Sequence, residues 1–274
     1  MMETIVNIVI LSVMELVYLF GIIIVVGFLL GYLETIAAQW AYKAFGKTGI
    51  LLTSCIGTPI HETGHALMCL LFGHKIISIK FFDLNPQNET LGYVQHSFDK
   101  NNLYQNMGNF FISLGPIFSG SAAILLFMYW LEPHTFSALR QMAESVPPVH
   151  TLTDLLSWSG HSMSIAYYGL WHSPSFGSLK YCAFLVLAIC ISSHIALSKM
   201  DMKNAMAGLS VTFFCVVVGN FIAIFFGIDT LYYVLEAANY NIYVLSILSV
   251  SLLFSLFTAM VMGVCTVFFT VHRN

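Results

Sequence analysis

The chain has 274 residues, of which 58% are hydrophobic and only 8% are charged, and its mean hydropathy is +0.82. A soluble globular domain of this length has too little interior to bury so much apolar surface. The composition therefore predicts a polytopic membrane protein surrounded by the lipid bilayer. The formal net charge is only −3 and no basic run is present, so we expect no nucleic-acid partner.

Six apolar runs each approach the roughly 20 residues that a helix needs to cross a bilayer. We expect an all-α fold with about six transmembrane helices, forming a single multi-pass domain over residues 1–274. The first run is too long for the apolar core of a signal peptide, and Glu3 stands where a basic segment would be needed, so we interpret it as a retained helix. The runs cover residues 5–30, 50–72, 106–131, 180–198, 208–227 and 242–270.

Residues 75–97 differ from these runs, because two short segments rich in β-branched and aromatic residues flank a polar loop. Residues 75–82 and 91–97 predict two strands, and Asn85 and Pro86 favour a loop between them. The sequence therefore predicts a β-hairpin. Two roles are open for it: a cap on the helices, or an edge strand beside the site that could hold an extended peptide by backbone pairing.

The longest polar connection covers residues 132–179 and holds prolines and tryptophans among serines and glycines. This composition predicts an interfacial loop with short helices. Gly160, Gly169 and Pro174 argue against one continuous helix within it.

The positions of the cysteines argue against disulfide bonds and against a metal site built from four cysteines. The six cysteines fall in or beside the apolar runs, and none has C-x-x-C spacing. This pattern favours neither a disulfide framework nor a four-cysteine metal site. We interpret the cysteines as small core residues.

The most informative motif is His61-Glu62-Thr63-Gly64-His65, an H-E-x-x-H sequence inside the second apolar run. Residues four apart share one face of a helix, so both imidazoles could bind one metal ion. Glu62 lies beside them, where it could take a proton from a metal-bound water. Imidazole ligands suit zinc, and such polar groups are costly in hydrocarbon unless they have a function. The motif therefore predicts one Zn²⁺ ion per chain, bound by His61 and His65.

The order of these features resembles the site-2 protease family of intramembrane zinc metalloproteases, over residues 50–208. The motif has Gly64 at its fourth position, as in the family's H-E-x-G-H, and short strands follow it. The segment Leu114-Gly115-Pro116-Ile117-Phe118-Ser119 is similar to the family's A-G-P-x-x-N segment, although Ser119 replaces Asn. Asp201 falls where the family places its L-D-G motif, although Met202 replaces Gly. The resemblance implies that Asp201 completes the metal site.

The third zinc ligand has two candidates, because a catalytic zinc takes three protein ligands and keeps one open position. His194 and Asp201 are seven residues apart and would share a face if one helix continued through both. His194 lies deep in its apolar run, whereas Asp201 is bracketed by Lys199 and Lys203, a setting that favours a solvated interfacial carboxylate. Either Asp201 binds zinc and His194 hydrogen-bonds the substrate or the transition state, or His194 binds zinc and Asp201 orients it. We prefer the first arrangement; a buried His194 with neither role is the third alternative.

These features predict a zinc metalloendopeptidase that hydrolyses peptide bonds in or near the transmembrane segments of membrane proteins. In this interpretation Glu62 activates a zinc-bound water and then delivers the proton to the leaving amine. One alternative is a membrane zinc hydrolase that acts on lipid amides or lipidated peptides. Another is a transporter or a non-catalytic membrane protein that binds helices. The intact Glu62 argues against a non-catalytic relative, because binding a helix requires no general base.

Overall fold

The structure is a computed structural model of the chain that describes residues 2–84, 91–144, 152–238 and 240–271. Within these residues the fold is helical, with one small antiparallel sheet, so the predicted all-α class with a hairpin is confirmed. In chain order the elements are α1 (Met2–Phe45), α2 (Lys47–Leu71), β1 (Lys75–Lys80), β2 (Tyr93–Ser97), α3 (Leu103–Leu131), α4 (Pro133–Glu144), α5 (Leu152–Trp171), α6 (Leu179–Ser192), α7 (Lys199–Phe225), α8 (Thr230–Ala238) and α9 (Asn241–Val271).

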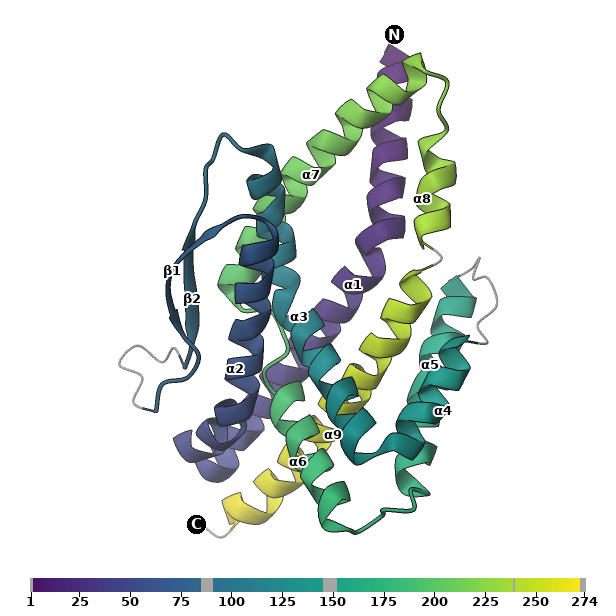
Figure 1. Cartoon of the computed structure of the whole chain (residues 1–274). Helices are drawn as coiled ribbons and strands as arrows, with labels where there is room; N and C mark the ends of the chain where they lie inside the picture. Colours follow the sequence, from purple (N-terminus) through teal and green to yellow (C-terminus); the bar gives the residue numbers. More distant parts are fainter. Residues whose placement is uncertain (1, 85–90, 145–151, 239, 272–274) are drawn as a thin grey trace.

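The helices form a bundle in which α2 packs against both α3 and α6, and the hairpin lies along the outer side of α2 (Figure 1). In the hairpin Lys75 pairs with Ser97 and Lys80 with Tyr93, with an irregularity between Ile76 and Ser78. The segment at 85–90, which includes the predicted loop residues Asn85 and Pro86, lies outside the described residues. On the other side of the bundle α1 packs along α9. The hairpin is therefore attached to the helix that carries the H-E-x-x-H motif.

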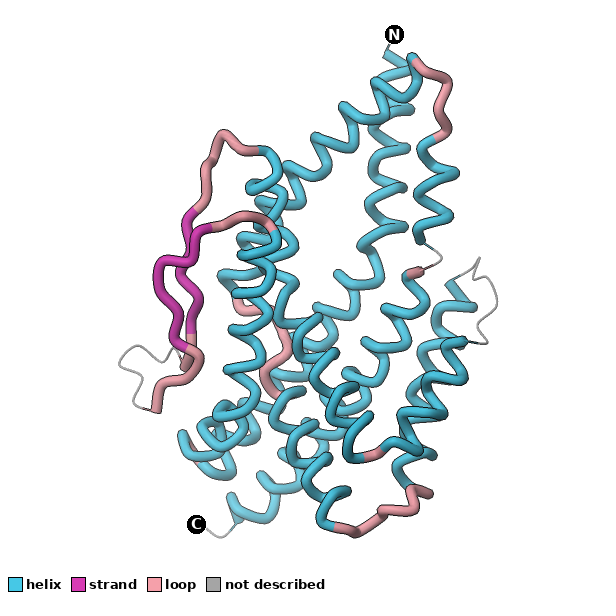
Figure 2. Tube along the Cα trace, in the orientation of Figure 1, coloured by secondary structure: helices cyan, strands magenta, loops and turns pink. Residues whose placement is uncertain are grey.

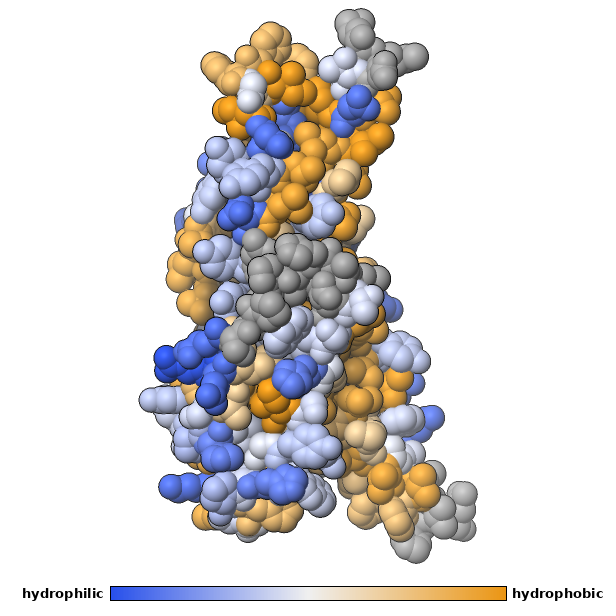
Figure 3. Space-filling model, turned by 90° about the vertical axis from the view of Figure 1, so that its right-hand side faces the viewer, coloured by the Kyte–Doolittle hydropathy of each residue, from blue (hydrophilic) through white to orange (hydrophobic). Residues whose placement is uncertain are grey.

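Four described helices are long and apolar enough to cross a membrane. They cover Thr4–Phe45, Leu103–Leu131, Lys199–Phe225 and Tyr243–Phe269. Large apolar side chains are exposed on them, including Val17 and Phe28 on α1 and Phe221 and Phe225 on α7. Figure 3 shows apolar residues gathered at the upper end of one face, where the N-terminus lies in Figure 1, and along its right-hand edge, with polar residues over much of the lower half. Such apolar surface suits contact with lipid rather than with water.

The predicted helix limits were wrong for the fourth and fifth apolar runs, at 180–198 and 208–227. Within the run at 180–198 the helix α6 ends at Ser192. The next helix, α7, begins at Lys199, nine residues before the predicted start at 208. Residues 193–198, here called the α6–α7 link, are not helical and lie within the bundle beside α2 (Figure 2). The helix does not continue from His194 to Asp201, so the face-sharing argument for this pair fails.

Two other boundaries were also wrong, because packing outweighs local glycine signals. The first helix does not end near residue 30; α1 continues to Phe45, and Ala37 and Ala41 are buried on it. Within the predicted loop 132–179, α5 runs through both Gly160 and Gly169, although residues 145–151 lie outside the described part. At Gly169 a Cβ would lie 2.8 Å from Thr135 of α4, so this glycine allows close packing instead of ending the helix.

A backbone contact between two glycines fixes how α2 and α3 cross. A Cβ at Gly64 would lie 2.4 Å from the carbonyl oxygen of Gly115, and a Cβ at Gly115 would lie 2.5 Å from that of Gly64. One turn away, the Ser119 hydroxyl donates a 2.8 Å hydrogen bond to the carbonyl oxygen of Ile60. Only glycine allows such an approach, which brings the H-E-x-x-H helix directly against the Gly-Pro segment of α3.

We expect Gly115→Ala to destabilise the protein, because the added methyl group has no space between α2 and α3. Overpacking of this kind costs about 1–3 kcal/mol. Gly219→Ala is the matched control, since Gly219 lies on exposed α7 surface with nothing within 4 Å of its Cβ position. Thermal unfolding in detergent would compare the two variants, and equal midpoints would contradict the close crossing.

Candidate metal centre

His61 and His65 lie one turn apart on α2 and direct their Nε2 atoms toward one point. The two Nε2 atoms are 3.2 Å apart. Two ligands at about 2.0–2.1 Å from one tetrahedral zinc would be about 3.3–3.4 Å apart, so the spacing fits a shared ion. His65 is buried and His61 is partly buried, which keeps both rings inside the protein.

The other nitrogen of each ring donates to a backbone carbonyl group. His61 Nδ1 donates to the carbonyl oxygen of His194 at 2.8 Å, and His65 Nδ1 donates to that of Ile112 at 2.8 Å. These bonds place the proton of each neutral ring on Nδ1 and leave the Nε2 lone pairs free. A histidine that binds a metal is usually oriented by such a bond, so both rings are prepared as ligands.

Proline and the helix break explain why these carbonyl groups are available. In α3 the carbonyl of Ile112 would normally accept from the N–H of residue 116, but Pro116 has no N–H. The carbonyl of His194 lies in the α6–α7 link, where no continuous helix can use it. Both acceptors are therefore backbone groups that regular helical bonding leaves unpaired, and the imidazoles satisfy them.

Asp201 faces the two imidazoles from the first turn of α7. Its Oδ1 lies 3.4 Å from His65 Nε2, and its Oδ2 lies 3.9 Å from His61 Nε2. Asp201 also closes a capping box: Oδ2 accepts from the Ser198 N–H at 2.9 Å, while the Ser198 hydroxyl accepts from the Asp201 N–H at 3.1 Å. The carboxylate is buried despite the flanking lysines, so it is not the solvated surface group that those lysines suggested.

The three side chains together fit a zinc site. One ligand atom from each of His61, His65 and Asp201 lies within 4.8 Å of the others. Two imidazoles and one carboxylate are a common ligand set of catalytic zinc, and they leave a fourth position open. Of the two arrangements considered from the sequence, the geometry favours the one in which Asp201 is the third ligand.

Glu62 lies beside this cluster and beneath the start of β2. It is buried, and it interacts electrostatically with both His65 and Asp201. A Cβ at Gly92 would lie 2.7 Å from Thr58 and 3.0 Å from Cγ of Glu62, so the chain passes directly over this part of α2 just before β2 begins. Glu62 is thus enclosed between the three candidate metal ligands and the hairpin segment.

His194 reaches the cluster through its main chain, while its ring points along α2. The ring Nε2 is 3.0 Å from Thr53 Oγ1 and 3.1 Å from Ser54 Oγ. A Cβ at Gly57 would lie 2.6 Å from the ring, which shows how closely the link packs on α2. The ring is not one of the three groups that surround the possible metal position. A catalytic role for the side chain stays a prediction.

Two residues that support the site were missed from the sequence. Glu34 of α1 accepts a 2.9 Å hydrogen bond from the N–H of Ala196 and so holds the α6–α7 link from the opposite side. Ser198 begins α7, and the spacing Ser198-x-x-Asp201 is a capping-box signature that could have located this start. Glu34 gives only a weak signal, namely a carboxylate within an apolar stretch.

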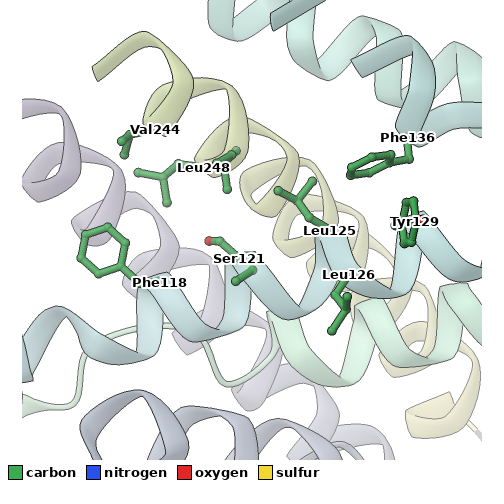
Figure 4. Close-up of a pocket in the computed structure, with 10 residues that line it drawn as sticks. Phe118, Ser121, Leu125, Leu126, Tyr129, Phe136, Val244 and Leu248 are labelled. Atoms are coloured by element: carbon green, nitrogen blue, oxygen red, sulfur yellow. The ribbon is translucent and has the colours of Figure 1, made fainter. Parts of the chain in front are cut away.

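A separate cavity of about 530 Å³ lies between α3, α4 and α9 (Figure 4). Its walls are apolar apart from Ser121 and Tyr129, and none of the metal-site residues lines it. The cavity offers apolar volume but no acid, base or metal ligand. It therefore supplies no chemistry to the candidate site.

We expect Asp201→Asn to lose one zinc per chain relative to the wild type while the protein stays folded. An amide oxygen can still accept the Ser198 N–H, so the change removes the charged ligand and keeps the cap. The affinity should fall by more than the about 10–100-fold that loss of a ligand's hydrogen-bond partner costs. Ser198→Ala is the control, because it weakens the cap by about 0.5–2 kcal/mol and keeps the carboxylate. Metal analysis with chelator competition would compare the zinc content and zinc affinity of the two variants with those of the wild type.

For His194→Gln we expect zinc to be retained, because the His194 carbonyl, and not its ring, contacts His61. The change removes the ring bonds to Thr53 and Ser54, so a lower unfolding midpoint is expected with unchanged metal content. Metal content and thermal unfolding, measured on one preparation, test this. Loss of one zinc would instead favour the arrangement in which the His194 ring is the third ligand.

No protein-family model matches the chain, and neither the curated proteins nor the solved structures include a detectably similar one.

Proposed function

We propose that the chain is a multi-pass membrane zinc metalloendopeptidase that cleaves peptide bonds in or near transmembrane segments of other proteins. One observation carries the proposal: His61, His65 and Asp201 converge at one point, with Glu62 buried beside them. This set supplies three zinc ligands and a general base, the minimum that a zinc peptidase needs. Its place among long apolar helices favours a substrate that is itself embedded in the membrane.

In this proposal α2 and α6 add two crossings to the four long apolar helices. The polar site residues lower the hydropathy of α2, although it packs between α3 and α6. The 14 residues of α6 extend only about 21 Å, less than the roughly 30 Å of hydrocarbon, so the α6–α7 link would complete the crossing. Non-helical backbone is tolerated at that depth when protein satisfies it. His61, Glu34 and Asp201 bond to three of its residues.

A zinc ion held by His61, His65 and Asp201 would polarise the scissile carbonyl group and make water a better nucleophile at neutral pH. Glu62 would take a proton from the attacking water and deliver it to the leaving amine. His194 and Ile112 would keep the two imidazoles oriented through their carbonyl oxygens. His194 is thus proposed as a positioning residue.

The hairpin is suited to present an extended substrate to Glu62. A transmembrane helix hides its amide groups in its own hydrogen bonds, so it must unwind before hydrolysis. Gly92, the residue before β2, lies against Thr58 and Glu62, and unpaired groups at a strand edge can bond to an unwound peptide. Backbone pairing of this kind would tolerate many substrate sequences.

We expect Glu62→Gln to abolish peptide hydrolysis while zinc stays bound, because Gln cannot accept the proton and Glu62 is not a ligand. Loss of a general base lowers the rate by about 10²–10⁴-fold. Thr63→Ala is the matched control, since the Thr63 hydroxyl is exposed and donates to the carbonyl oxygen of Pro59 on the same helix. Both variants and the wild type would be compared in liposomes on a panel of single-span peptides.

Three outcomes would distinguish the proposed peptidase from a lipid hydrolase and from a protein that binds no zinc. Cleavage by wild type and Thr63→Ala, with zinc but no cleavage in Glu62→Gln, would support the peptidase. Release of fatty acid from lipid amides without peptide cleavage would identify a lipid hydrolase instead. A wild-type protein that binds no zinc under non-chelating purification would overturn the proposal.

A further inference from the structure

A second group of metal-binding side chains lies one turn beyond the candidate centre. Cys69 is on α2, His74 follows that helix, and His96 is on β2. One ligand atom from each lies within 4.8 Å of the others. Cys69 and His74 are buried and His96 is half-buried, so the group sits at the seam between the helix and the hairpin. None of the three takes part in the chemistry proposed for Glu62.

The His74 imidazole is oriented as a metal ligand is, and the His96 imidazole faces it. His74 Nε2 donates to the carbonyl oxygen of Gln105 at 2.8 Å, which leaves the lone pair of His74 Nδ1 free. That Nδ1 lies 2.9 Å from Nδ1 of His96. The arrangement repeats that of His65, whose outer nitrogen also donates to a carbonyl of α3 while its inner nitrogen faces a second imidazole. A backbone carbonyl behind the ring is the usual support of a ligating histidine.

Cys69 supplies the ligand that makes the group selective for zinc. Its side chain is fully buried, and the thiolate is a strong ligand for zinc. Zinc takes sulfur at about 2.3 Å and imidazole nitrogen at about 2.0–2.1 Å, so ligand atoms around one ion lie about 3.3–3.7 Å apart. Side-chain rotation closes the remaining distance, and binding displaces the thiol proton into solvent. A water molecule would be the fourth ligand of such an ion.

We propose that Cys69, His74 and His96 bind a second zinc ion that fastens strand β2 to the end of the H-E-x-x-H helix. The ion is structural, and its binding does not depend on the peptidase activity. It joins three segments: the last turn of α2, the turn after it, whose His74 N–H donates to the Cys69 carbonyl oxygen, and β2. The Gln105 carbonyl adds the start of α3 to the same junction.

Such a tether would set the position of the hairpin over Glu62. Gly92 lies against Thr58 and Glu62, and His96 is four residues further along the same extended segment. A strand rises about 3.3 Å per residue, so an anchor at His96 holds a point about 13 Å away. A two-stranded sheet is marginal on its own, and a metal bridge is an effective way to order it.

Metal analysis tests the second site directly, because the two sites can be emptied separately. The wild type should hold two zinc ions per chain, and the double variant His61→Ala/His65→Ala should hold one. Cys69→Ser and His96→Gln should each hold one less than the wild type. Cys190→Ser is the matched control, since Cys190 is also a buried helical cysteine but lies on α6. It should keep both ions.

Cobalt provides a readout that is independent of activity. Cobalt bound by a thiolate gives a near-ultraviolet charge-transfer band, which a site of imidazole and carboxylate lacks. The band should appear in the wild type, in His61→Ala/His65→Ala and in Cys190→Ser, and should vanish in Cys69→Ser. A wild type without the band, or Cys69→Ser with unchanged zinc content, would overturn the second site. If peptides are not cleaved but the band is present, the proposed function fails and this site stands.

Discussion

A buried imidazole must satisfy both of its nitrogens, and the candidate centre depends on how this is done. His61 and His65 can turn their inner nitrogens toward a metal only if their outer nitrogens have acceptors within the protein. Helical backbone rarely offers one, because its carbonyl groups are already bonded. This fold supplies two exceptions: the carbonyl of Ile112, which Pro116 leaves without a helical partner, and the carbonyl of His194 in the α6–α7 link. Ile112 and His194 each contribute a backbone carbonyl to this orientation and not a side chain.

Close helix contact is what brings those carbonyl groups within reach. Gly64 meets Gly115 backbone to backbone, and Gly57 lies against the carbonyl oxygen of Cys190 and the ring of His194. A methyl group at any of these positions would push α2 away from a neighbour that orients a histidine. The small residues thus serve the orientation of the histidines as well as the packing, and they explain why α2 sits so tightly between α3 and α6.

The parts of this structure that follow from local sequence could be predicted, and those set by distant contacts could not. The H-E-x-x-H pair lies on one face because helical periodicity requires it, and the hairpin follows from β-branched segments around a turn. The α6–α7 link was hidden, because Ile195, Ala196 and Leu197 continue an apolar run without Gly or Pro. Its path depends on Glu34, more than 160 positions earlier in the chain.

Other differences arose because a weak local preference yielded to packing. Gly160 and Gly169 each cost a helix about 1 kcal/mol relative to alanine, yet α5 continues through both, and Gly169 fits closely against Thr135. Lys199 and Lys203 suggested a solvated Asp201, but the capping box turns that carboxylate into the bundle. The sequence associated His194 with the site through its side chain, and its separation from α2 along the chain could not reveal that its carbonyl oxygen would be the group in contact with His61.

Asp201 is both a candidate metal ligand and a member of the capping box that begins α7, so the position of the ligand depends on the first turn of this helix. The ends of helices fray more readily than their centres, and here the first turn of α7 carries a candidate metal ligand. An ion that binds this carboxylate would hold the turn closed, and a well-formed turn would in the same measure raise the affinity for the ion. Folding of the last third of the bundle and occupancy of the centre would then be one linked equilibrium. A protein that loses its ion would begin to loosen at Ser198.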